Sequence, residues 1–146
     1  MSTRTEIATT RFLSGYNCAQ AVLYAFRDEA GLDEDLALKI ATGLGAGMGR
    51  KQEVCGAVTG GILVLGLRHG RGSTDDHSAT EQTYLRTREL MDRFAAKHGS
   101  CLCRQLLQGY DLATEQGLRR AKADDVLNKV CRSCVQTVIE TLEQLK

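Results

Sequence analysis

The chain has 146 residues, which is enough for one domain to bury an apolar core without crosslinks. Its 19 Lys and Arg against 18 Asp and Glu give a net charge of +1, so no overall field favours nucleic acid or an acidic membrane surface. No stretch reaches the roughly 18 apolar residues of a membrane span, and the polar N-terminus leads into no signal-type segment. We therefore expect one cytoplasmic domain, residues 1–146, with no nucleic-acid partner and no membrane partner.

The first half of the chain predicts helices interrupted by glycine. Proline is absent and aromatic residues make up 5% of the chain, which favours helices over a sandwich or barrel. Apolar spacing predicts a helix over 16–30 that stops at Gly31, and Asp33 can cap a second helix over 34–42. A third helix is expected from about Glu53 to residues 69–70.

The second half predicts a long helix followed by shorter ones. The long helix covers residues 80–97 and ends at Gly99, with a charged outer face. Ser100 can then cap a short helix through Leu107, and Asp124 can cap a last helix with a nearly unbroken apolar stripe. The whole pattern predicts an all-α fold, a single compact bundle of about five to six helices with a glycine-rich loop.

The glycine-rich loop is the most unusual segment of the sequence, because glycine occupies every second position from 43 to 49. It is not a Walker A loop, since it lacks the four-residue gap and the Ser or Thr after Lys51. It is not a G-x-G-x-x-G dinucleotide-binding motif either, because Met48 stands where the last glycine should be. Its backbone N–H groups could form an anion nest with two cations, or its small residues could serve a tight helix crossing. The candidate cofactor-binding residues are Gly45, Gly47, Gly49, Arg50, Lys51 and Gly56.

The six cysteines indicate metal binding or redox chemistry, because thiols are kept reduced in the cytoplasm. Cys131 and Cys134 are three residues apart on one helix face, where they could meet each other or a common metal, or simply pack in the core. Cys55 and Cys103 are both expected near a helix N-terminus, which would lower their thiol pKa. We therefore expect Cys55 and Cys103 to be the most reactive.

Several sequence blocks form one ordered pattern, namely 15–22, 43–49, 53–61, Gly99, 103–107 ahead of 110–112, and Cys131 in the final helix. From about Ser14 to Leu142 this pattern resembles the C_GCAxxG_C_C family of redox-active proteins. It implies an all-helical domain in which Cys18, Cys55, Cys103 and Cys131 form a redox centre such as an iron–sulfur cluster. Similar segments also occur in some multihaem electron-transfer proteins. Cys101 and Cys134 lie outside the family pattern and are possible resolving thiols or alternate ligands.

Three functions remain open at this point. The four pattern cysteines could carry out thiol/disulfide exchange or electron transfer with a redox partner protein or a small-molecule thiol. They could instead be the four thiolate ligands of an iron–sulfur cluster or another metal. The cysteines of a helical interaction protein could also be plain core residues. For the redox functions we expect Cys18, Cys55, Cys103 and Cys131 to converge beneath the glycine-rich loop. The sequence leaves the electron donor and acceptor and the oligomeric state open.

Overall fold

The computed structural model describes residues 2–146, and within that range it contains helices and no strand. The all-α prediction is confirmed, although the helices outnumber the expected five to six. None of the described helices is long and apolar enough to cross a membrane. The helices are α1 (Thr3–Leu13), α2 (Cys18–Ala25), α3 (Glu34–Ala41), α4 (Gly45–Met48), α5 (Gly56–His69), α6 (Ser78–His98), α7 (Cys103–Leu106), α8 (Glu115–Ala123) and α9 (Arg132–Gln144). The 3-10 turns are η1 (Arg27–Ala30) and η2 (Thr42–Leu44), and η3 (Leu127–Cys131) is π-helical.

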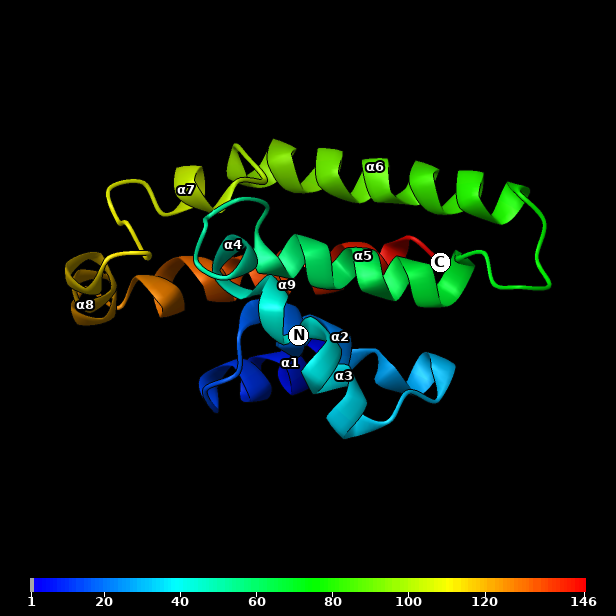
Figure 1. Ribbon diagram of the computed structural model, residues 1–146, viewed down its shortest axis with the longest axis horizontal. Helices are drawn as coiled ribbons and strands as arrows, with labels where there is room; N and C mark the ends of the chain where they lie inside the picture. The colour runs from blue at the N-terminus through cyan, green and yellow to red at the C-terminus, as the bar shows by residue number, and fades with distance from the viewer. Residues whose placement is uncertain (1) are drawn as a thin grey trace.

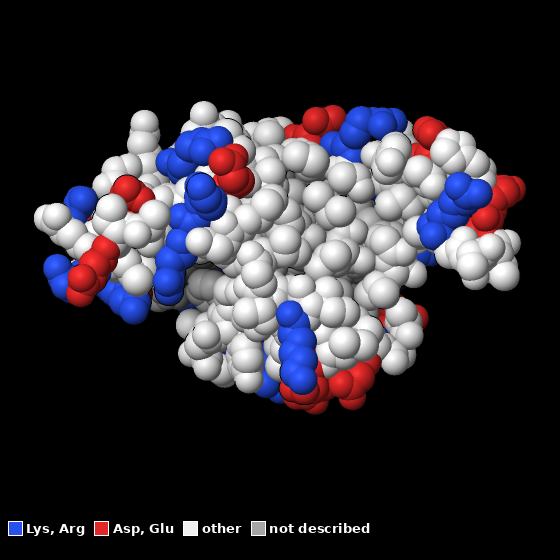
Figure 2. Space-filling model, in the orientation of Figure 1, with Lys and Arg blue, Asp and Glu red and all other residues white. Residues whose placement is uncertain are grey.

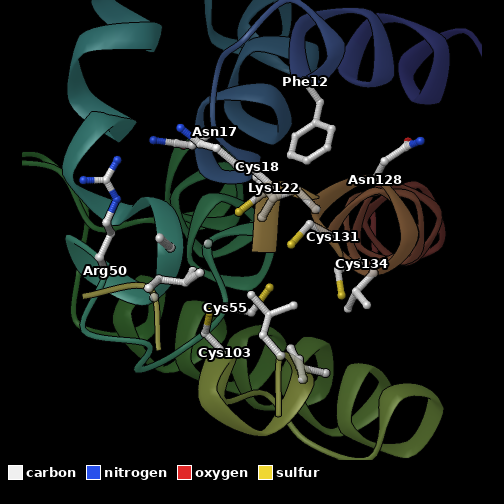
Figure 3. A pocket seen from close by; sticks show the side chains of 18 of the residues that line it. Phe12, Asn17, Cys18, Arg50, Cys55, Cys103, Lys122, Asn128, Cys131 and Cys134 are labelled. Atoms are coloured by element: carbon white, nitrogen blue, oxygen red, sulfur yellow. The ribbon is translucent and has the colours of Figure 1, made fainter. Parts of the chain in front are cut away.

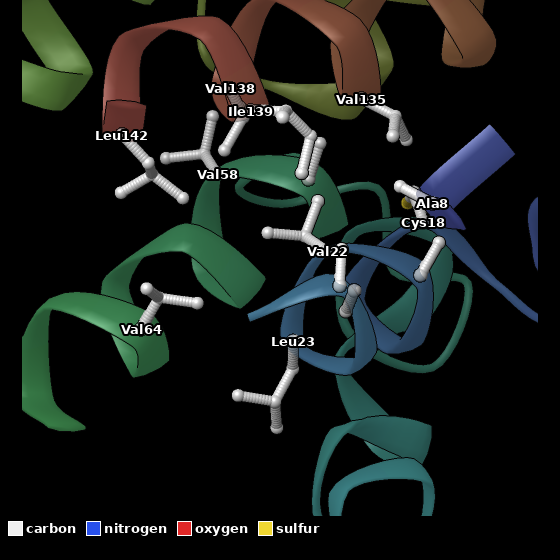
Figure 4. Packing of buried hydrophobic residues seen from close by; sticks show 14 of the residues in the cluster. Ala8, Cys18, Val22, Leu23, Val58, Val64, Val135, Val138, Ile139 and Leu142 are labelled. Atoms are coloured by element: carbon white, nitrogen blue, oxygen red, sulfur yellow. The ribbon is translucent and has the colours of Figure 1, made fainter. Parts of the chain in front are cut away.

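Helix α5 is the central element of the fold. It packs against α2, α6 and α9, and α1 packs against both α2 and α9 (Figure 1). The core between these helices is aliphatic, with Val22 of α2, Val58 of α5 and Ile139 of α9 fully buried (Figure 4). A Cβ at Gly60 would lie 2.8 Å from the carbonyl oxygen of Ala19, so this glycine allows α2 and α5 to cross at close range.

The N-terminal region differs from the prediction in its helix boundaries. The expected helix over 16–30 is divided into α2 and η1, and Gly31 ends the latter with a φ of 62°. Asn17 caps α2 in a capping box with Gln20. Helix α1 was not predicted as a helix of its own. It buries only Thr5 and Ala8, so its apolar pattern is weak.

Two later predictions are confirmed at the level of single residues. Asp33 caps α3, and its Oδ2 accepts a hydrogen bond of 3.0 Å from the backbone N–H of Leu36. Gly99 ends α6 with a φ of 87°. The predicted long helix over 80–97 corresponds to α6, which is only slightly longer.

Three other boundaries were wrong. Helix α5 starts at Gly56 rather than near Glu53, because Val54 forms an antiparallel bridge with Leu102. Helix α8 was not predicted, since only Gly117 and Ala121 are buried in it. Asp124 ends α8 instead of capping the last helix, which begins through the π-helical turn η3.

Candidate functional site

The glycine-rich loop forms a left-handed turn from Ala46 to Arg50, and the short element α4 is part of this turn rather than a regular α-helix. The φ angles of these five consecutive residues lie between 54° and 70°. The left-handed conformation destabilises the folded state by about 1–2 kcal/mol for each residue with a side chain. Glycine at positions 47 and 49 avoids this penalty at those two positions. Hydrogen bonds close the turn, from Gly49 N–H to Gly45 O at 3.0 Å and from Glu53 N–H to Gly47 O at 2.9 Å. This turn covers one side of the site.

A short extended pairing brings two of the cysteines together. The N–H of Cys55 donates to the carbonyl oxygen of Cys101 at 2.7 Å, and the N–H of Cys103 donates to that of Glu53 at 2.7 Å. The two segments are far apart in the sequence, so this pairing places Cys55 at the start of α5 beside Cys103 at the start of α7. Neither position was anticipated as part of an extended segment.

Gln52 connects the glycine-rich loop to the segment around Tyr110 and Leu112, a role that was not predicted from the sequence. Its side-chain amide donates to Tyr110 O at 2.9 Å and accepts from the N–H of Leu112 at 2.9 Å. Its side chain also lies beside the Cys103 sulfur, where it partly opposes the rise that burial causes in the pKa of this thiol. Because Gln52 lies in a charged, polar stretch, no sequence pattern marks it as buried.

Five cysteines line a single cavity of about 430 Å³. Cys18, Cys55, Cys103, Cys131 and Cys134 contribute to its lining, and Figure 3 shows their sulfurs around it. The structure thus brings together all four of the predicted cysteines, while their redox roles stay predictions. Cys101 is not among the lining residues, and its thiol donates to Met91 O at 3.3 Å.

The sulfurs surround the cavity rather than pointing to one spot. The thiols of Cys134 and Cys18 neighbour that of Cys55 and shift its pKa, and all six cysteines are free thiols. Among residues 2–146, no group of three or more His, Cys, Asp or Glu side chains is arranged to hold one metal ion.

The expected lowering of the pKa of Cys55 and Cys103 was wrong. Burial raises the pKa of Cys103 to about 11, and the neighbouring Cys134 thiol, together with burial, raises that of Cys55. Cys55 is the N-cap of α5, α7 has only four residues, and Arg50 and Lys51 are exposed to solvent. Desolvation raises the pKa of these two thiols by more than the nearby helix N-termini can lower it.

Polar donors nevertheless point at several of the sulfurs. The backbone N–H groups of Ala46 and Ala19 lie near the Cys18 sulfur, and that of Ala57 lies near the Cys55 sulfur. Each lowers the pKa of the thiol it contacts, although the neighbouring Cys55 thiol and burial still hold the pKa of Cys18 well above its ordinary value. These donors stabilise negative charge on sulfur once it forms.

The candidate cofactor-binding residues divide into two groups. Gly47, Arg50 and Gly56 line the cavity, whereas Gly45, Gly49 and Lys51 do not. A Cβ at Gly56 would lie 2.6 Å from Cys18 Sγ, so only glycine leaves room for the sulfur there.

The lining residues that were not predicted include the polar side chains of Asn17, Lys122 and Asn128. Asn17 could have been found from its capping-box spacing with Gln20, which fixes the first turn of α2, where Cys18 lies. The other two carry no such signal, because they come from α8 and η3, whose packing the sequence did not predict.

The fold and the site define an all-α protein with a buried group of cysteine thiols around one cavity. Residues 16–145 match the family described as "Putative redox-active protein (C_GCAxxG_C_C)", and the chain belongs to this family. Comparison with curated proteins and with solved structures gives no match.

Proposed function

We propose that this chain is an electron-transfer protein whose cavity holds an iron–sulfur cluster. The proposed ligands are the thiolates of Cys18, Cys55, Cys103 and Cys131. The observation that carries the proposal is the convergence of sulfurs from four separate parts of the chain on one cavity. Iron–sulfur clusters are held by four cysteine thiolates spread over more than one iron atom, so their ligands surround a volume rather than a point.

The polar groups near the sulfurs support the same proposal. The N–H groups of Ala19 and Ala46 would hold the Cys18 thiolate, and the Gln52 side chain would hold that of Cys103. When bound, the cluster would supply one-electron redox chemistry, with a potential that depends on such hydrogen bonds and on burial. The raised thiol pKa values agree with ligand rather than nucleophile roles, since a buried protonated thiol is a poor nucleophile and metal binding displaces the proton.

Anaerobic purification tests the proposal. We expect absorbance between about 300 and 500 nm, together with protein-bound iron and sulfide. Cys131→Ser should reduce the iron content and the absorbance. Cys101→Ser is the matched control, because Cys101 lies outside the cavity and serine can still donate to Met91 O. A colourless protein that takes up no iron and sulfide on reconstitution contradicts the proposal.

Thiol/disulfide exchange is the second candidate, and a different contact favours it. The Cys55 thiol neighbours those of Cys18 and Cys134, so oxidation could join it to either one without moving the helices far. The two thiols would lose two protons and two electrons, which a disulfide of a redox partner protein or of a small molecule would accept as it is reduced to two thiols. Cys134, which the family pattern does not require, would then be a resolving thiol.

Mapping disulfides by peptide mass spectrometry separates the two candidates. For the second one, metal-free protein treated with an oxidised small-molecule thiol should form a Cys55–Cys134 or Cys18–Cys55 bond that dithiothreitol reverses. Cys134→Ser should then abolish the first bond while leaving any iron content unchanged. If no bond involving Cys55 forms, the exchange function is ruled out.

A further inference from the structure

The cavity extends beyond the cysteines into an apolar region. Its lining there includes Phe12, Leu106, Leu112, Leu118, Leu127 and Val130, which lie on α1, α7, α8 and the segments around them. A volume of about 430 Å³ falls within the range of about 300–1,000 Å³ typical of small-molecule pockets. The cavity is therefore large enough for an organic molecule, and one of its walls is suited to an apolar body.

The mouth of the cavity carries two cations without a partner. Arg50 and Lys122 line the cavity and are exposed, and neither forms an ion pair or side-chain hydrogen bond within residues 2–146. Among the arginines of residues 2–146, Arg50 shares this with Arg88, whereas Arg4, Arg11, Arg68, Arg93, Arg104 and Arg119 form ion pairs. Lys122 resembles most of the lysines, since Lys39 is the one lysine of the described residues that is paired.

One acidic group, Asp125, also lines the cavity. Its carboxylate accepts a hydrogen bond of 3.3 Å from the side-chain amide of Asn128, so it already has a partner. The charged groups of the lining thus sum to a positive charge. Figure 2 shows a hollow in the surface between the regions of α8 and α1, bordered by Lys and Arg side chains.

We propose that this cavity binds a small aromatic anion, such as an arenesulfonate or an aromatic carboxylate. Its ring would lie against the apolar wall, where Phe12 and Tyr16 also contribute aromatic surface, and its charge would lie at the mouth with Arg50 and Lys122. Burial of the ring supplies most of the affinity, because it is removed from water. The cations distinguish anions from neutral molecules of the same shape. This inference goes beyond the proposed function, since it requires neither a cluster nor a disulfide.

Three probes with one ring system test the charge preference. Naphthalene-2-sulfonate should bind more tightly than 2-naphthol, and 2-naphthylmethylammonium should bind most weakly, as measured by isothermal titration calorimetry on the reduced full-length chain. Each exposed cation is expected to change the Kd about two- to fivefold, since exposed ion pairs contribute modestly. The preference for the sulfonate should decrease as the salt concentration rises.

Variants locate the site. Arg50→Gln and Lys122→Gln should each weaken sulfonate binding about two- to fivefold and leave naphthol binding unchanged. Lys51→Gln is the matched control, because Lys51 is exposed, adjacent to Arg50 and outside the cavity lining. Leu127→Ala removes part of the apolar wall from a partly exposed position, so it should weaken all three probes by the same factor.

The proposal is overturned if naphthol binds as tightly as the sulfonate, if Lys51→Gln has the same effect as Lys122→Gln, or if none of the probes binds. Iron content and absorbance measured on the same samples are independent of these results. Failure of the anion site therefore leaves the proposed electron-transfer function standing, and the reverse is also true.

Discussion

Gly56 and Cys18 are in direct van der Waals contact across the crossing of α5 and α2. A Cβ added at Gly56 would lie 2.6 Å from Cys18 Sγ and 3.0 Å from Leu44 O. The glycine that follows Cys55 therefore sets the position of a different cysteine. This contact links the start of α5 to the start of α2 and holds the sulfurs of Cys18 and Cys55 at one end of the cavity.

Gly56→Ala should destabilise the protein by about 1–3 kcal/mol, because the added methyl group overpacks a fully buried contact. It should also displace Cys18 and so reduce the iron content if a cluster is bound. Gly66→Ala, in the same helix, has nothing within 4 Å of the added Cβ and should be neutral or stabilising by about 0.5–1 kcal/mol. Urea unfolding monitored by circular dichroism compares the two. Equal effects would mean that the Gly56 contact is unimportant.

The left-handed turn makes a second prediction about stability. Met48 has a φ of 70° and is partly exposed, so Met48→Gly should stabilise the protein by about 1 kcal/mol through relief of backbone strain. Gly49 has a φ of 61° and open space around it, so Gly49→Ala should destabilise by a similar amount. Denaturation midpoints measure both. Shifts of the same sign in the two variants would argue against a left-handed turn.

Cysteine reactivity should follow burial. Cys101 is partly exposed and outside the cavity, so iodoacetamide near neutral pH should label it first in the reduced, metal-free protein. Cys18 and Cys55 are buried and have raised pKa values, so they should react slowly. Peptide mass spectrometry over a time course resolves the order. Rapid labelling of Cys55 would restore the reactive role expected from the sequence.

Stability should decrease at alkaline pH in the reduced, metal-free protein. Cys103 has a pKa of about 11 in the folded state, against an ordinary value of 9.0. Between these pH values the unfolded chain releases the proton that the folded chain keeps, so the free energy of unfolding decreases as the pH rises. Burial and the neighbouring thiols also raise the pKa of Cys131, so this residue too makes the free energy of unfolding decrease as the pH rises. Thermal unfolding from pH 8 to 11 measures this slope, which should be shallower in Cys103→Ala. An unchanged slope in that variant would contradict the burial of the Cys103 thiol.

Much of the local structure was determined by the sequence alone. The absence of proline and the apolar spacing were enough for the all-α class, and Asp33 and Gly99 marked helix ends correctly because capping depends on neighbouring residues only. The resemblance to the redox-active family indicated which four cysteines to consider together. Helix class, helix ends and the cysteine pattern depend on residues close together in the sequence or on their order, so they can be recognised without knowing how the helices pack.

The tertiary structure decided the chemistry of the site. The pairing of segments 52–55 and 101–104 turned an expected helix start into an extended strand-like contact, and it buried Cys55 and Cys103. Gln52 became an anchor of the cavity, Cys134 entered its lining and Cys101 stayed outside it. A thiol pKa depends on desolvation and on neighbours that are distant in sequence, so the direction of these shifts was set only when the chain folded.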